Sequence, residues 1–228
     1  MTQPVSQASA PDEGLLLREL THRINNEFAS AISTVCLTAA RSSNNEVKVA
    51  LNAVAKRLHY HAEVHRSLRM PEHDAHVDAA AFVYKLCQAI NRSKLADTKI
   101  RLVFVTSPLW LASNRCWRLG MIVYELVTNA ARHAFADANG EIRVELRHAG
   151  AFAECRVLDN GSASKGLRPG HGLKIVRELV KALDGRFEQQ LGSGGSRSSL
   201  IFPCGDAARV ERNSTMNATG HVSDRSPL

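Results

Sequence analysis

A long amphipathic segment, residues 15–41, most constrains what this chain can fold into. Its apolar residues recur every three or four positions, as on one face of an α-helix: Leu20, Ile24, Phe28, Ile32, Val35 and Ala39. A second segment, from Val47 to Leu68, repeats in steps of four and three and ends at Met70-Pro71. The short polar turn between the two segments predicts an antiparallel helical hairpin. Because a hairpin cannot cover its own apolar stripe, we expect a homodimer that completes a four-helix bundle.

The periodicity changes after a polar linker at 72–77, and helical and strand patterns then alternate. Helices are predicted at 79–95, from an N-cap at Ser113 to residue 134, and at 172–183 with Gly185 as the C-cap. Strands are predicted at 99–105, 141–147, 153–157, 186–191 and 196–202, with a hairpin turn at 148–150. This order indicates a mixed sheet with helices on one face, a two-layer α/β sandwich.

The predicted fold class is therefore α+β, with the helical hairpin first and the sandwich second. We expect a disordered N-terminus at 1–14, the hairpin at 15–71, the sandwich at 78–205 and a disordered tail at 206–228.

The composition restricts the cellular setting and the partners. No run of about 18 apolar residues is present, which argues against a membrane span, and the first 13 residues do not resemble a secretory signal. The five cysteines lack any C-x-x-C pairing, which argues against a disulfide framework or a zinc site and favours the cytoplasm. The net charge is +7, but the basic residues are scattered, so an acidic protein surface is a better partner than nucleic acid.

One histidine in the first segment, His22, lies away from the apolar stripe, with Glu19 and Asn26 on the same outer face. An exposed imidazole flanked by an acid and an amide is able to act as a nucleophile. A solvated surface histidine is the more common interpretation of such a pattern, so the rest of the chain has to decide.

The helix predicted to end at residue 134 has a polar face formed by Glu125, Asn129 and Arg132, with His133 at its margin. An acid, an amide oxygen and a guanidinium in a row suit a triphosphate that carries Mg²⁺. The same pattern is also typical of the solvated face of an ordinary amphipathic helix.

Two glycine-containing motifs follow. In Asp159-Asn160-Gly161, at the end of a predicted strand, the carboxylate can accept a hydrogen bond from an exocyclic amine such as that of adenine, and the glycine would let the ring approach the backbone. Gly170-His171-Gly172-Leu173 enters a predicted helix, where free N–H groups bind phosphate. Alone, the first motif is more often a turn, and two glycines are weak evidence.

In their order and spacing, these motifs resemble the ATP-binding domain of sensor histidine kinases, in the GHKL ATPase superfamily. Residues 125–135 are similar to the N box, 159–161 and 170–173 to the two glycine boxes, and Gly195-Ser196 to the late Gly-[ST] element. The run from Glu19 to Phe28 is similar to the E-L-x-H-R-x-x-N-x-L pattern of the HWE kinases and their sister HisKA class. The Trp-x-Glu element of the HWE class is missing, so the sister class is the nearer match.

The resemblance implies an enzyme that uses ATP to phosphorylate His22, with Glu19 and Asn26 as its flanking helpers. The phosphoryl group would then pass to an aspartate in the receiver domain of a response regulator. Mg²⁺ would bind Asn129, with Glu125 positioning the metal or a proton acceptor. The other implied nucleotide contacts are Arg132, His133, Asp159, Gly161, Gly170, Gly172, Leu173 and Ser196.

The chain departs from the family pattern at Ala163, which replaces the second glycine of the first box, and at Arg132, where Lys is more usual. One alternative is a histidine phosphotransfer protein whose degenerate ATP domain only docks a response regulator. Another is an anti-sigma protein-serine kinase, which the hairpin with His22 disfavours. The residues before Leu15 are too few for a ligand-binding domain, so we expect a separate sensor protein or partner to supply the signal.

Overall fold

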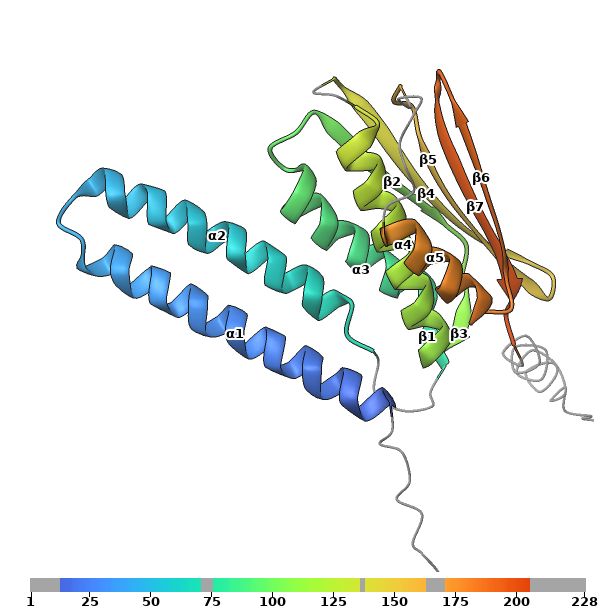
Figure 1. Ribbon diagram of the computed structural model, residues 1–228, viewed down its shortest axis with the longest axis horizontal. Coiled ribbons are helices and arrows are strands. Elements are labelled where there is room, and N and C mark those ends of the chain that lie inside the picture. Colours follow the sequence, from blue (N-terminus) through green and yellow to red (C-terminus); the bar gives the residue numbers. More distant parts are fainter. Residues whose placement is uncertain (1–12, 71–75, 136–137, 163–170, 206–228) are drawn as a thin grey trace, which may run out of the picture. The chain divides into compact units, whose positions relative to one another are not determined.

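The computed structural model describes residues 13–70, 76–135, 138–162 and 171–205. It divides into two compact units, residues 1–69 and 70–228 (Figure 1). Most of the predicted N-terminal segment and the predicted tail lie outside the described residues, as do Ala163 and Gly170.

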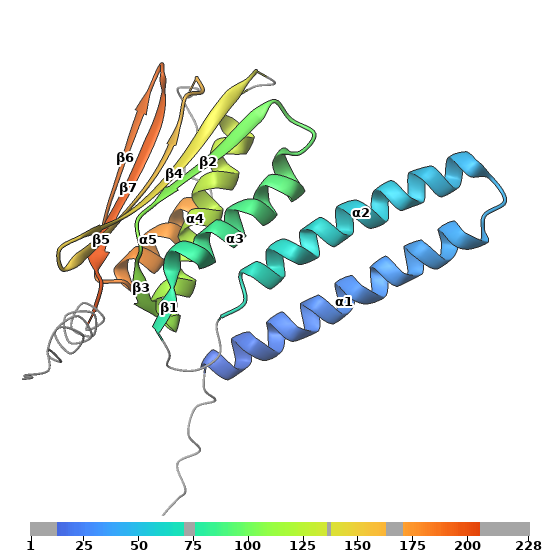
Figure 2. The same cartoon turned by 180° about the vertical axis from the view of Figure 1, so that it is seen from behind.

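The first unit is a helical hairpin, as predicted. Helix α1 (Glu13–Arg41) and helix α2 (Asn45–Ser67) run antiparallel, joined by a short turn (Figures 1 and 2). The Asn44 side chain caps α2, because its Oδ1 accepts the backbone N–H groups of Glu46 at 2.8 Å and Val47 at 3.4 Å. The residues buried between the helices are mostly small: Ala39, Ala55, Ala62 and Val64.

Several large apolar side chains of the hairpin remain exposed in the single chain. Leu20 is 55% exposed, Leu37 57% and Val49 63%, and Val47 and Val54 of the predicted seam are exposed as well. Small residues let the two helices approach closely, and the larger side chains then lie at the sides of the hairpin. An apolar surface of this kind is typical of a helix pair that packs against further helices.

The second unit has a five-stranded sheet with three helices on one face (Figure 2). The strand order is β2-β4-β5-β7-β6, in which only β2 and β4 are parallel. The strands are β2 (Ile100–Thr106), β4 (Gly140–Ala149), β5 (Phe152–Asp159), β6 (Arg186–Gly192) and β7 (Gly195–Pro203). The covering helices are α3 (Ala79–Ile90), α4 (Ser113–His133) and α5 (His171–Lys181). The predicted α+β class and the mixed sheet are thus confirmed.

The core lies between the sheet and these helices. Strand alternation buries Ile142, Val144 and Leu146 of β4, and α4 buries Leu119, Ile122 and Val123 against the sheet. The opposite residues of β4 point to the outer face of the sheet and are charged. The packed face of α4 fixes the direction of its polar face, and therefore the position of the predicted N box.

Local details differ from the sequence predictions at both predicted helix caps. Ser113 is buried as the first residue of α4, and the capping position is Ala112, the end of strand β3, which makes no side-chain cap bond. After α5, the residue in the left-handed conformation is Asp184 (φ 54°), whose short polar side chain tolerates it. Gly185 follows, and its N–H is donated to the carbonyl oxygen of Val180.

The predicted linker and the predicted turn also need correction. Strand β1 (His76–Asp78) occupies the end of the linker and pairs with β3 (Trp110–Ala112). Three-residue strands are too short to show a period in the sequence, so their pairing with residues 32–36 positions away decides that they form. The turn between β4 and β5 lies at Gly150 and Ala151, because cross-strand pairing extends to Ala149 and Phe152, and Gly150 supplies the positive φ of 65°. Helix α3 continues into one π-helical turn, η1 (Asn91–Leu95).

Candidate active site

Helix α4 presents the predicted polar face at its C-terminal half. Glu125 and Asn129 are half-buried, whereas Arg132 and His133 are exposed. Val123, Leu126 and Val127 are buried on the other side. The helix therefore holds the acid and the amide at the boundary of the core, with the cationic groups in solvent.

The start of α5 lies directly against this polar face. A Cβ atom on Gly172 would stand 2.5 Å from Oε2 of Glu125 and 3.3 Å from Nδ2 of Asn129. Only a glycine leaves the two side chains where they are. Because the first N–H groups of a helix are free to bind anions, an acid, an amide and an anion-binding helix end meet here. Leu173 follows as a half-buried residue.

The Asp159 carboxylate, at the end of β5, is held by the beginning of β7. Its Oδ1 accepts the backbone N–H groups of Gly161 at 3.1 Å and Ser196 at 3.2 Å, and its Oδ2 accepts the Ser196 hydroxyl. A carboxylate has about four lone-pair sites, so three hydrogen bonds leave roughly one for a ligand donor. This geometry suits a single exocyclic amine, and it brings together two motifs that are 37 residues apart.

Two glycines close the loop around Asp159. A Cβ atom on Gly161 would overlap the carbonyl oxygen of Ala134, the residue that follows α4, and one on Gly195 would overlap the carbonyl oxygen of Asp159. Gly195 also has a φ of 126°, which favours glycine. The contact with Ala134 gives a structural reason for glycine at this position, because Gly161 joins the loop to the end of the N-box helix. Access of a ring to the backbone at Gly161 stays a prediction.

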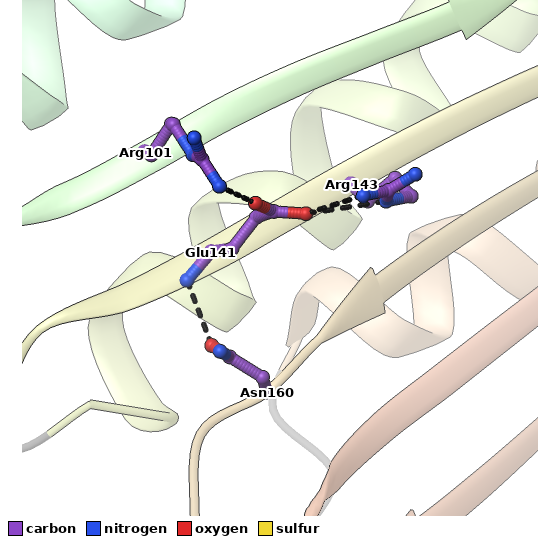
Figure 3. A network of polar contacts seen from close by, with 4 residues as sticks. All are labelled: Arg101, Glu141, Arg143 and Asn160. Carbon is purple, nitrogen blue, oxygen red and sulfur yellow. Dashed lines mark hydrogen bonds and ion pairs between the residues drawn. The ribbon is translucent and has the colours of Figure 1, made fainter.

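Asn160 is a site residue that the sequence reasoning missed. Its Oδ1 accepts the N–H of Glu141 at 2.7 Å, and its own N–H is donated to the Glu141 carbonyl at 3.3 Å. The Glu141 carboxylate is bound by Arg101 and by Arg143 (Figure 3). These hydrogen bonds lower the pKa of Glu141, with Arg143 contributing most. The network attaches the Asp159 loop to β2 and β4, and the only sequence signal for it was the Asn between Asp159 and Gly161.

Electrostatics distinguish Glu125 from the exposed acids. Partial burial raises its pKa, and the nearby Arg132 offsets part of the rise. The neighbouring Tyr124 has a raised pKa for the same main reason, with Glu125 adding to the effect. A desolvated carboxylate with a raised pKa is a better proton acceptor than a surface one, and its oxygens suit a hard cation.

His22 lies in the helical unit, separate from the residues above, and it is exposed on α1. Its Nδ1 is 3.2 Å from Nδ2 of Asn26, one turn later. The carboxylate of Glu19 is bound to Arg23, with Oε1 2.9 Å from Nε. The two predicted neighbours of His22 therefore differ: the amide contacts the imidazole, and the acid pairs with an arginine.

Comparison with known proteins finds family models that match parts of both units. A family model described as Histidine kinase (HisKA_2) matches residues 19–94, which include His22. A second, described as Histidine kinase-, DNA gyrase B-, and HSP90-like ATPase, matches residues 117–206, which include every described residue of the α4, Asp159 and α5 site. The chain thus combines a histidine kinase region with an ATPase region of the histidine kinase type. The family resemblance inferred from the motifs is confirmed.

Individual relatives agree with this assignment. The chain is 31% identical over 227 residues to the sensor histidine kinase PdtaS of Mycolicibacterium smegmatis, covering 92% of this chain and 44% of PdtaS. The chain thus spans less than half the length of that relative. Within the residues that the structure describes, no helix is both long and apolar enough to cross a bilayer.

Solved structures show the same fold. The histidine kinase domain of a blue-light-activated histidine kinase from Erythrobacter litoralis superposes with a TM-score of 0.59 at 20% identity, covering 81% of this chain and 98% of that domain. A bacterial phosphotransferase gives a TM-score of 0.57 at 14% identity, covering 87% of this chain and all of the other (100%).

Proposed function

We propose that this chain is an ATP-dependent protein histidine kinase that transfers the γ-phosphoryl group of ATP to His22. The observation that supports the proposal most is the convergence of three distant segments on one site. These are the polar face of α4, the start of α5 and the loop that carries Asp159. A helix N-terminus that can bind phosphates and a carboxylate with one open acceptor position suit the two ends of a nucleoside triphosphate.

In this proposal Asp159 binds the exocyclic amine of adenine through its remaining lone pair, and Gly161 and Ser196 hold the carboxylate in place. The phosphates bind at the N-terminus of α5, where Gly172 and Leu173 lie. Gly170, the other proposed phosphate contact, lies outside the described residues. Arg132 and His133, both exposed, contribute positive charge or hydrogen-bond donors to the phosphate oxygens.

The residues also fit Mg²⁺. Asn129 and Glu125 offer an amide and a carboxylate oxygen from adjacent turns of α4, next to Gly172, and Mg²⁺ prefers a few hard oxygen ligands from the protein. Bound there, the metal would neutralise phosphate charge. The contribution of the chain is to hold these oxygens at the edge of the core, where Gly172 leaves them room.

The reaction follows from the exposure of His22. A neutral ring nitrogen attacks the γ-phosphorus, the bond to the β,γ-bridging oxygen breaks, and ADP leaves. Catalysis of this kind depends mainly on positioning and on stabilisation of charge. The phosphoryl group then passes to an aspartate in the receiver domain of a response regulator.

The exposed apolar side chains of the hairpin support the homodimer, because a second hairpin would cover them. The five cysteines are free thiols, which supports a cytoplasmic location.

The test is incubation with γ-labelled ATP and Mg²⁺, followed by treatment of the labelled protein with acid and base. We expect an acid-labile, base-stable label on the wild type and none on His22→Ala, which should still bind ATP in calorimetry. The matched control His59→Ala removes another exposed histidine, on α2, and should be labelled like the wild type.

Other outcomes would contradict the proposal and favour the alternatives. Retained acid-labile label on His22→Ala would exclude His22 as the acceptor. An acid-stable label would favour a protein-serine kinase. A wild type that binds no ATP in calorimetry would favour the phosphotransfer protein with a degenerate ATP domain.

A further inference from the structure

Arg115, the third residue of α4, connects the first turn of that helix with the C-terminal end of α5. Its Nη2 donates hydrogen bonds to the carbonyl oxygens of Leu183 and Pro203, both at 2.7 Å. Pro203 ends β7, and Leu183 continues the helical hydrogen bonding of α5, because its N–H is donated to the carbonyl oxygen of Leu179. One guanidinium group thus binds a helix end and a strand end.

The Leu183 carbonyl needs a donor from outside its own helix. The last carbonyl oxygens of a helix have no intrahelical partner, and a cation near them interacts favourably with the helix dipole. The side chain of Arg115 is 16% exposed, with Nη1 3.9 Å from a carboxylate oxygen of Asp184. Its Cζ atom lies 5.8 Å from the centre of the Phe202 ring. A charged donor in this partly desolvated position makes strong, directional hydrogen bonds.

Stability alone does not explain an arginine at this position. Nε of Arg115 is buried and has no hydrogen-bond partner among the residues that the structure describes. An unpaired buried donor costs folding free energy, and an apolar side chain of similar size often stabilises a fold as well as a buried charge does. The burial of Val176, Val180 and Leu183 already holds α5 on the core, but hydrophobic burial is non-directional. The two hydrogen bonds of Arg115 add a directional constraint.

The other end of α5 carries the proposed phosphate site. Gly172 lies against Glu125 there, since a Cβ atom on the glycine would stand 2.5 Å from Oε2. Arg115 precedes Glu125 by ten residues on α4, and Leu183 follows Gly172 by eleven along α5. At about 1.5 Å per residue these separations are about 15 Å and about 16.5 Å, so the two antiparallel helices are in contact at both ends. A shift of α5 along α4 that broke the Arg115 bonds would also move Gly172 away from Glu125.

We propose that Arg115 is a positioning residue that fixes α5 along α4 and so keeps the N-terminus of α5 at the polar face of α4, where the phosphates bind. This inference rests on the proposed function. Arg115 lies about 15 Å from Glu125 along α4 and acts through α5 as a rigid helix. Adenine binding should depend on it much less, because Asp159 is held by Gly161 and Ser196.

The test compares ligands with and without phosphates on the full chain. In Arg115→Met, the dissociation constant of Mg²⁺-ATP in calorimetry should rise about tenfold, whereas that of adenosine in an NMR titration should stay within about twofold. In the milder Arg115→Lys, which keeps a cationic donor, the loss for Mg²⁺-ATP should be about threefold. The matched control Arg177→Met removes the same charge from the exposed surface of α5 and should bind both ligands like the wild type.

A second measurement needs no nucleotide. Burial raises the pKa of Glu125 above the ordinary value of 4.5, and Gly172 lies next to the carboxylate. If α5 moves, the carboxylate becomes more exposed, so its pKa should fall towards 4.5 in Arg115→Met and stay raised in Arg177→Met. Carboxyl ¹³C chemical shifts in a pH titration report this pKa, with the Glu125 signal identified by its loss in Glu125→Gln.

An equal loss for adenosine and Mg²⁺-ATP would overturn the proposal, because a general loss of structure affects both ligands. So would wild-type affinity for Mg²⁺-ATP in both Arg115 variants, or an unchanged pKa of Glu125 in Arg115→Met. If Arg115→Met does not fold, the same titrations on Arg115→Lys decide. If the wild type binds no Mg²⁺-ATP, the proposed function fails, whereas the Glu125 titration still decides whether Arg115 positions α5.

Discussion

Replacing Gly172 with alanine tests whether the start of α5 and the polar face of α4 form one site. The new Cβ atom would lie 2.5 Å from Oε2 of Glu125 and 3.3 Å from Nδ2 of Asn129. The first distance is far below a van der Waals contact, so Glu125 must move. The carboxylate is at the end of a flexible side chain, and it can rotate toward solvent without displacing the backbone.

The effects on folding stability largely cancel. Alanine in place of glycine stabilises a helix by up to about 1 kcal/mol. An unfavourable rotamer of Glu125 costs about 0.5–1.5 kcal/mol. The free energy of unfolding should therefore change by no more than about 1 kcal/mol in either direction. Binding should change more, because a hydrogen bond or ligand contact to a charged group contributes about 1.5–3 kcal/mol, equivalent to roughly a ten- to hundredfold loss of affinity for Mg²⁺-ATP.

The assay combines urea unfolding with calorimetric titration of Mg²⁺-ATP. The control is Gly194→Ala in the turn between β6 and β7, where no heavy atom lies within 4 Å of the new Cβ, and both its stability and its affinity should stay near the wild-type values. Wild-type affinity in Gly172→Ala would refute the assignment of Glu125 and Asn129 to the phosphate end of the site. A loss of several kcal/mol in stability would show that Glu125 cannot move away as described.

Two further substitutions and one chemical modification test the site and the core. Gly161→Ala should lower the free energy of unfolding by about 1–3 kcal/mol, because its Cβ meets the rigid backbone of Ala134; an unchanged urea midpoint would contradict this. Glu125→Gln should stabilise the protein at pH 7–8 but not below the unfolded pKa of 4.5. The raised folded pKa means that the native state binds the proton more tightly, so wild-type stability falls as pH rises through that pKa, and urea titrations at several pH values should show the difference. Ellman's reagent should modify the exposed Cys36 rapidly and the other four thiols only after unfolding, since they are buried and burial raises the pKa of Cys87, Cys116 and Cys155 to about 12; more than one fast thiol would refute the packing.

Patterns that depend on neighbouring residues were predictable. The period of three and four located α1, α2 and α4, and strict alternation located β4 and β5, since each period follows from the geometry of one element. The same reasoning placed Glu125, Asn129 and Arg132 on one face. It was wrong about the cap at Ser113, because the strand β3 runs directly into the helix.

Contacts within the site were less predictable. A sequence motif does not specify which rotamer a long side chain adopts, so the pairing of Glu19 with Arg23 was not foreseen. The role of Asn160 was missed because its partner, Glu141, lies 19 residues earlier and is reached only through the pairing of β4 with β5.

The two modules, the class of the fold and the family resemblance follow from the sequence alone, because periodicity and motif spacing are recorded along the chain. Tertiary packing was needed to show that Gly172 lies against Glu125, that Gly161 leaves room for the carbonyl group of Ala134, and that Ser196 binds Asp159. These contacts join residues 27–47 positions apart, and sheet pairing and helix packing bring them together. Short-range sequence patterns predict the helices and strands, whereas the site forms only when the strands have paired and the helices have packed on the sheet.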